Sequence, residues 1–205
     1  MKMNSIVLAI TGASGAIYGL TLAKELLSSG MHLTMLVSGT GFQVIREETG
    51  LDLKGGSGDV LQALEAYLGP APGQLEYFSE DDFFAPVASG SSAPDCMVIC
   101  PCSMGTLSRI ACGNSRTLLE RCADVMIKER RPLALVPRET PLSEIHLENM
   151  LKLSRLGARI VPARPAFYQR PESMDDLVNF VVGKVLDSLG IENRLYKRWV
   201  GKTGD

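Results

Sequence analysis

Residues 5–19 read SIVLAITGASGAIYG, an apolar run followed at once by a glycine-rich turn and the start of a helical pattern. Six strand-forming residues that stop at Thr11 and Gly12 predict a buried β-strand. The stretch AIYGLTLAKELL then predicts a helix over 16–27. A strand that runs through a tight turn into a helix is the first half of a parallel βαβ unit, so this stretch favours an α/β fold.

The same alternation continues along the chain. Further apolar runs lie at 32–37, 95–100, 132–137 and 158–163, and the helical patterns that follow them lie at 41–48, 104–111, 117–129, 143–156 and 174–189. Strands separated by helices predict a doubly wound parallel sheet. The Gly- and Pro-rich stretch 55–74, with one short amphipathic helix, is interpreted as an excursion between strands.

Three helix boundaries carry sequence signals. Thr140 before Pro141 predicts the start of one helix, and Gly157 predicts its end. Ser173, followed three residues later by Asp176, predicts the start of the last helix.

Composition limits the kinds of protein this can be. With 205 residues, 45% of them hydrophobic and 21% charged, the chain can bury one core, and we expect a single domain over residues 1–205. A formal net charge of -2 gives no cationic field for nucleic acid or an anionic membrane. Five cysteines and no apolar run of about 18 residues predict free thiols in a cytoplasmic protein.

The turn TGASG at 11–15 predicts an anion-binding site, because such a turn leaves backbone N–H groups at the start of a helix. A purely geometric use of glycine is the alternative. The spacing Gly12-x-x-Gly15-x-x-x-Gly19 departs from the dinucleotide fingerprint, and Ser38 stands where a nicotinamide-binding unit would place an acidic residue. A small hydroxyl at that position suits a phosphate or a ribityl chain better than a ribose diol.

Two later strands end in similar signals. The third runs into PCSMGT at 101–106, which offers N–H groups and hydroxyls at the same carboxyl edge of the sheet. Cys100-x-Cys102 could be a metal or redox pair, but no second cysteine pair or nearby histidine accompanies it, which favours small buried residues. The fourth strand ends in Arg138 and Glu139, a cation and a carboxylate that could hold a phosphate and move a proton.

Three other positions are ambiguous from the residues alone. Lys128 ends a helix in the run KERR and needs no function there. Lys184 lies on or beside the apolar stripe of the last helix, where a lysine either extends to solvent or has an anionic partner. Tyr168 follows the last strand, and a tyrosine is as often a core residue as a ligand-binding one.

Taken together, these segments resemble the UbiX-type flavin prenyltransferases. The resemblance rests on TGASGAIYG, the run PCSM-x-T-L-x-x-I-A-x-G, residues 119–131, the run V-x-RETPL, and RPAFY, in order from residue 11 to 168. It implies a flavodoxin-like Rossmann variant assembled into a homododecamer. It also implies transfer of a dimethylallyl group from dimethylallyl phosphate to reduced FMN, which yields prenylated FMN for a UbiD-type decarboxylase. One departure is Gly105, where members commonly carry Lys or another polar residue.

The resemblance also assigns roles to residues. It implies FMN contacts at Gly12, Ala13, Ser14, Ser38, Ser103, Met104, Gly105, Thr106 and Arg138. Tyr168 and Lys184 match positions that bind the prenyl phosphate, with Arg121, Lys128 and Glu139 completing the phosphate site and Glu48 nearby. Basic side chains would stabilise the departing phosphate without a metal ion, and Glu139 and Ser14 would move protons.

Two other functions remain open from the sequence. One is an FMN-dependent cysteine decarboxylase of the phosphopantothenoylcysteine type, which needs a histidine base, whereas only His32 and His146 exist and neither is well placed. The other is a flavin-binding subunit without catalytic activity. The residues do not decide between a monophosphate and a diphosphate donor, nor which decarboxylase receives the product.

Overall fold

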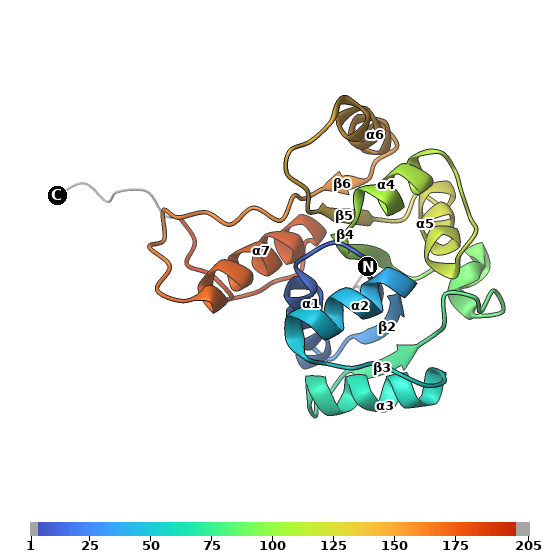
Figure 1. The fold of residues 1–205 in the computed structure, drawn as a ribbon, viewed down its shortest axis with the longest axis horizontal. Coiled ribbons are helices and arrows are strands. Elements are labelled where there is room, and N and C mark those ends of the chain that lie inside the picture. The colour runs from blue at the N-terminus through green and yellow to red at the C-terminus, as the bar shows by residue number, and fades with distance from the viewer. Residues whose placement is uncertain (1–3, 200–205) are drawn as a thin grey trace.

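Residues 4–199 are described by a computed structural model of the chain. A six-stranded sheet with all neighbouring strands parallel forms its centre, and helices cover both faces (Figure 1). The order is β3-β2-β1-β4-β5-β6. The strands are β1 (Ser5–Ile10), β2 (His32–Val37), β3 (Gln74–Tyr77), β4 (Cys96–Cys102), β5 (Leu133–Pro137) and β6 (Arg159–Ile160). The predicted doubly wound α/β fold is confirmed.

The helices form two layers. They are α1 (Ala16–Ser28), α2 (Gly39–Thr49), α3 (Ser57–Leu68), α4 (Met104–Ala111), α5 (Leu118–Lys128), α6 (Glu144–Arg155) and α7 (Met174–Leu189), with short 3-10 turns at Pro86–Ala88 and Gly90–Ser92. Buried side chains of α1, α2, α3 and α7 pack into one core cluster, and those of α4, α5 and α6 pack into the other.

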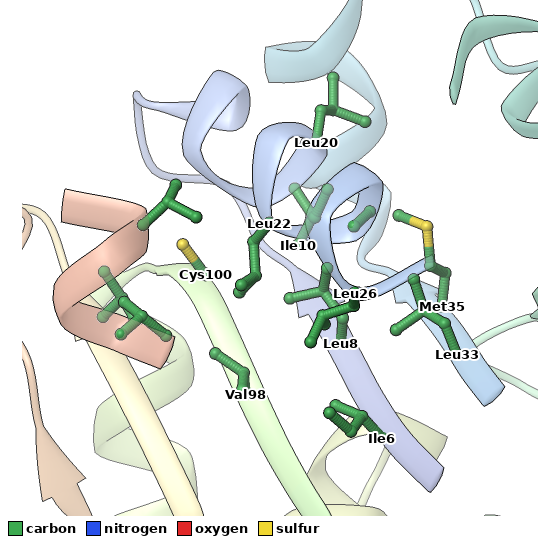
Figure 2. Packing of buried hydrophobic residues seen from close by; sticks show 14 of the residues in the cluster. Ile6, Leu8, Ile10, Leu20, Leu22, Leu26, Leu33, Met35, Val98 and Cys100 are labelled. Atoms are coloured by element: carbon green, nitrogen blue, oxygen red, sulfur yellow. The ribbon is translucent and has the colours of Figure 1, made fainter. Parts of the chain in front are cut away.

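Strand β1 shows why the sequence folds this way. Its alternate residues Ile6, Leu8 and Ile10 join the first cluster, whereas Val7 and Ala9 join the second. Figure 2 shows the first cluster, where side chains of α1 lie over β1 and its neighbours β2 and β4. A strand that is buried on both faces must be apolar throughout, which explains the unbroken run at 5–10.

Strand β3 was not predicted. Its four residues, QLEY, include one buried side chain and follow a Gly- and Pro-rich stretch, so they carry no apolar run to signal a strand. Without it, the remaining five strands have the order 2-1-3-4-5, which is the flavodoxin-like arrangement. The short extra strand extends the edge beside β2.

Two predicted boundaries differ from the structure. Helix α6 does not start at Thr140, because Ser143 and His146 form a reciprocal capping box, with Ser143 N donating to His146 Nδ1 at 3.2 Å. Strand β6 is only two residues long, although the expected run was 158–163. Val161 N and Ala163 N still donate to Leu135 O at 2.8 Å and to Pro137 O at 3.1 Å, but Pro137 of β5 has no N–H with which to return a bond. The capping of α7 by Ser173 and Asp176 is confirmed, as is the left-handed Gly157 after α6.

Strand order fixes where a ligand can bind. From β1 the chain adds β2 and β3 on one side, and it then adds β4, β5 and β6 on the other, so the strand order reverses between β1 and β4. Ligands of open α/β sheets bind at the carboxyl edge beside such a switch point. The turns after β1, β2, β4 and β5 all lie on this edge.

Candidate active site

Hydrogen bonds join three of the turns at the carboxyl edge. The hydroxyl of Thr11, directly after β1, donates to Pro101 O at 2.9 Å and accepts from Ser103 N at 2.8 Å. Arg138, directly after β5, donates from Nε to Ser14 O at 3.2 Å. These contacts hold the predicted residues Ser14, Ser103 and Arg138 in one connected site.

The turn after β2 packs against the turn after β1. A Cβ added at Gly12 would lie 2.2 Å from Thr40 Oγ1, so only glycine allows this approach. Ser38 begins α2, and its hydroxyl accepts from Gly41 N at 3.1 Å. Gly12 therefore has a packing role here, and Ala13 beside it is buried.

The start of α1 already holds a carboxylate. Glu48 on α2 accepts from Gly15 N at 3.1 and 2.9 Å through its two oxygens, and from Ala16 N at 2.8 Å. The sequence predicted free N–H groups at this helix start, so these two donors are a correction. A carboxylate is stabilised there by the partial positive charge of the helix. Glu48 therefore belongs to the site as a cap that joins α1 to α2.

The start of α4 forms a polar network. Ser103 Oγ accepts from Thr106 N at 3.2 Å, and Thr106 Oγ1 lies 3.0 Å from Ser103 Oγ and 3.2 Å from Arg109 Nη2. Arg109 Nε in turn donates to the buried carboxylate of Glu120. A Cβ added at Gly105 would approach only Arg109 Nη1, at 3.4 Å, so the space beyond Gly105 is open. Met104 is buried beneath this turn.

Glu139 lines a cavity beside this site. The cavity of about 160 Å³ is bounded on the β5 side by Arg138 and Glu139 and on the β6 side by Arg164. Glu139 is exposed, and its Oε1 accepts from Thr140 N at 3.0 Å. An exposed carboxyl group that lines a cavity together with two arginines is placed to meet an anion bound there.

Arg121 and Lys128 lie near opposite ends of α5. Arg121 donates from Nε to Ala88 O at 3.0 Å and pairs with Asp124 at 2.7 Å. Lys128 ends α5, pairs with Glu129, and lines a cavity of about 720 Å³. That cavity lies at the amino end of β5, whereas Glu139 lies beyond its carboxyl end. The five residues of β5 separate the two ends of the strand by about 17 Å. One chain therefore does not bring Lys128 and Glu139 together.

Tyr168 and Lys184 form a third group. Tyr168 is 49% exposed, and its ring meets Phe180 of α7 edge-on at 6.0 Å. Lys184 is exposed one helical turn after Phe180. Figure 1 shows α7 and the segments on either side of it extending beyond the sheet. Of the two predicted ligands of the prenyl phosphate, Tyr168 thus contacts α7 and Lys184 lies on it.

Three residues at the edge were missed from the sequence. From the sequence, Thr11 marks only the end of the first strand. Tyr18 packs beneath Gly15, and burial raises the pKa of its phenol, with Arg138 opposing the rise. Glu80 accepts from Gly39 N at 3.1 Å, and burial raises the pKa of its carboxyl. Glu80 could have been found only if β3, just before it, had been recognised.

The cysteines behave as small buried residues. All five are free, and Cys112 alone is exposed. Burial raises the pKa of Cys102 to about 12, and burial also raises the pKa of Cys100, so neither is a reactive thiolate at neutral pH.

Residues 4–199 contain no group of three or more His, Cys, Asp or Glu side chains that could hold a metal ion. Within the same range, no helix has the length and apolar character needed to cross a membrane.

Comparison with known proteins identifies the family. The Flavoprotein family model matches residues 1–186. Flavin prenyltransferase UbiX of Pseudomonas aeruginosa is 53% identical over 95% of this chain and 93% of its own. A crystal structure of AnUbiX in complex with FMN and dimethylallyl pyrophosphate is 39% identical with a TM-score of 0.87, covering 98% of this chain and 99% of its own. A dodecameric FMN-dependent UbiX-like decarboxylase from Escherichia coli O157:H7 is 39% identical with a TM-score of 0.84, covering 96% of this chain and 100% of its own. The chain therefore belongs to the Flavoprotein family and, within it, to the UbiX-type flavin prenyltransferases, which confirms the resemblance seen in its sequence.

Proposed function

We propose that this protein is a transferase that joins the dimethylallyl group of dimethylallyl phosphate to reduced FMN and releases prenylated FMN for a UbiD-type decarboxylase. The observation that carries the proposal is the connected set of turns at the switch point, where hydroxyls, backbone N–H groups and Arg138 face one edge. We also propose that residues 1–205 form one domain and that the protein acts in the cytoplasm.

The carboxyl edge suits FMN as a bound substrate. Arg138 offers a guanidinium to the flavin phosphate, and the hydroxyls of Ser14 and Ser38 suit its ribityl chain. The 103–106 turn adds the Ser103 hydroxyl and the open space beyond Gly105. Gly12 and Ala13 offer backbone groups to FMN at the turn after β1. When bound, reduced FMN supplies the electron-rich nitrogen and carbon that receive the dimethylallyl group.

We assign the phosphate of the donor to Arg121, Lys128, Tyr168 and Lys184. An allylic carbon–oxygen bond breaks easily only if the departing phosphate is stabilised, and basic side chains supply that stabilisation without a metal ion. Lys128 and Glu139 lie at opposite ends of β5, so we propose that neighbouring protomers complete one another's sites. Glu139 and Ser14 then move protons, with Glu48 holding the turn that carries Ser14.

A homododecamer would supply those neighbours. Two observations favour assembly: the dodecameric relative, and the apolar side chains that a single chain leaves exposed. The exposed side chains include Phe83 and Phe84 before β4 and Ile145, Leu147, Leu151 and Leu156 in or after α6.

The cysteine decarboxylase alternative lacks a histidine base. His32 starts β2, at the amino edge of the sheet, where its Nε2 lies 3.2 Å from Glu76 Oε2. His146 is engaged in the cap of α6. Within residues 4–199, neither imidazole makes a hydrogen bond to the turns that carry Ser14, Ser38 and Ser103, so we favour the prenyltransferase.

Release of inorganic phosphate tests the proposed reaction. Anaerobic incubation with reduced FMN and dimethylallyl phosphate should release phosphate at the same rate with and without excess chelator, because basic side chains replace a metal ion. Dimethylallyl pyrophosphate, assayed in parallel for the release of pyrophosphate, identifies the preferred donor. Activity that is lost in chelator and restored by magnesium would contradict the assignment of the phosphate site. A protein that binds FMN but releases neither phosphate from dimethylallyl phosphate nor pyrophosphate from dimethylallyl pyrophosphate would be a flavin-binding subunit.

A further inference from the structure

One carboxylate on α7 gathers the segment that follows the helix. Asp187 accepts from Asn193 Nδ2 at 2.9 Å, from Arg198 Nη2 at 2.7 Å and Nη1 at 3.2 Å, and from the hydroxyl of Tyr196. All three donors lie in residues 191–199, which we call the C-terminal segment. A single carboxylate with this many charged and neutral donors fixes the path of the chain.

The charge state of Asp187 agrees with this geometry. Burial acts to raise the pKa of its carboxyl, but hydrogen bonds from Arg198, Tyr196 and Asn193 outweigh burial, so the pKa is lowered. The side chain is 18% exposed. It is therefore ionised at neutral pH, when its acceptor capacity is greatest.

Packing around Tyr196 makes the arrangement specific. Its ring centroid lies 5.1 Å from that of Phe180, and the Arg198 guanidinium lies over the Tyr196 ring, 5.6 Å from its centre. A Cβ added at Gly183 would lie 2.4 Å from this ring. The glycine in α7 thus creates the space in which Tyr196 reaches Asp187.

The C-terminal segment in turn contacts the loop that carries Tyr168. The ring of Trp199 meets Tyr168 edge-on, with centroids 5.7 Å apart and an interplanar angle of 90°. Gln169 Nε2 donates to Lys197 O. Tyr168 is therefore held between Phe180 of α7 and Trp199 of the segment, and only the second of these contacts depends on Asp187.

We infer that Asp187 is a positioning residue for Tyr168. It acts through Tyr196, Arg198 and the C-terminal segment and does not itself contact substrate. When the carboxylate holds the segment, Trp199 fixes the Tyr168 ring, and when it does not, Tyr168 has lost one of its two ring contacts. The consequence for catalysis rests on the proposed function, in which Tyr168 binds the prenyl phosphate.

The Asp187→Asn variant tests this inference in the full-length protein. The chain contains a single tryptophan, so intrinsic tryptophan emission reports only on Trp199. We expect the anisotropy of that emission to fall, because the segment is no longer fixed. We also expect KM for dimethylallyl phosphate to rise on the order of tenfold, as when only about a tenth of the molecules hold Tyr168 in the competent position. FMN affinity and kcat at saturating donor should be unchanged.

Two further variants keep the test decisive. Asp175→Asn makes the same chemical change at an exposed position in the first turn of α7 and should change neither quantity. Tyr196→Phe keeps the ring but removes one donor to Asp187, and it should shift anisotropy and KM in the same direction by less. Unchanged anisotropy and KM in Asp187→Asn would overturn the inference, and so would a parallel loss of FMN affinity. If the parent protein makes no product, the proposed function fails, and the anisotropy still decides whether Asp187 holds the segment.

Discussion

The Glu139→Gln variant is expected to bind FMN as the parent protein does and to form prenylated FMN about 10²- to 10⁴-fold more slowly, the range typical of general acid–base groups. Glutamine keeps the size of the side chain and an oxygen that can accept from Thr140 N, but it has no exchangeable carboxyl proton. Glu139 lines the cavity beside Arg138 and takes no part in the contact between Arg138 and Ser14. The loss should therefore appear in chemistry and not in FMN binding. Single-turnover reactions with reduced FMN measure it.

The neighbouring Arg138→Ala variant is the converse control. It should weaken FMN binding by about 1.5 to 3 kcal/mol, the scale of a hydrogen bond to a charged group. If Glu139→Gln forms product at the parent rate with equal FMN affinity, Glu139 has only a structural role, and the proton must move through Ser14 and the phosphate.

The Lys128→Met variant is expected to lose about 10²- to 10³-fold in kcat, as when one group that stabilises transition-state charge is removed. Lys128 is exposed and pairs only with the exposed Glu129 in the described chain, so its loss should cost little stability. FMN affinity should be unchanged, because Lys128 is assigned to the phosphate of the donor and not to FMN. Lys24→Met, at an exposed position on α1, is the matched control and should retain full activity.

Mixed oligomers extend this prediction to the assembly. If Lys128 of one protomer completes the site that contains Glu139 of another, co-expression of the Lys128→Met and Glu139→Gln chains should restore some sites. Roughly a quarter of them would contain both native residues, since each residue is intact in half of the chains. Activity no higher than that of the two variants alone would contradict a site shared between protomers.

The sequence predicted those parts of the fold that depend on local patterns. Strands β1, β2 and β5 are buried on both faces and therefore appear as apolar runs, and Ser173 with Asp176 forms the cap that the spacing predicts. Strand β3 was missed because its pairing with β2 stabilises it at the edge, and four residues of which only Tyr77 is buried carry no such pattern.

The site was predicted only as far as strand ends determine it. Ser14, Ser38, Ser103 and Arg138 each follow a parallel strand, so topology brings them to one edge. Contacts between distant segments could not be read from spacing. The approach of Glu48 to the start of α1 depends on how α2 packs, and the separation of Lys128 from Glu139 becomes evident only when the length and direction of β5 are known.

The mass of the recovered flavin is the most direct test of the central claim that this protein prenylates FMN. The protein is incubated anaerobically with reduced FMN and dimethylallyl phosphate, and the flavin is then released and analysed by mass spectrometry. We expect a flavin heavier than FMN by one isoprene unit, with an absorbance spectrum unlike that of FMN. Flavin recovered at the mass of FMN from a protein that binds both FMN and the donor, with either the phosphate or the pyrophosphate, would contradict it.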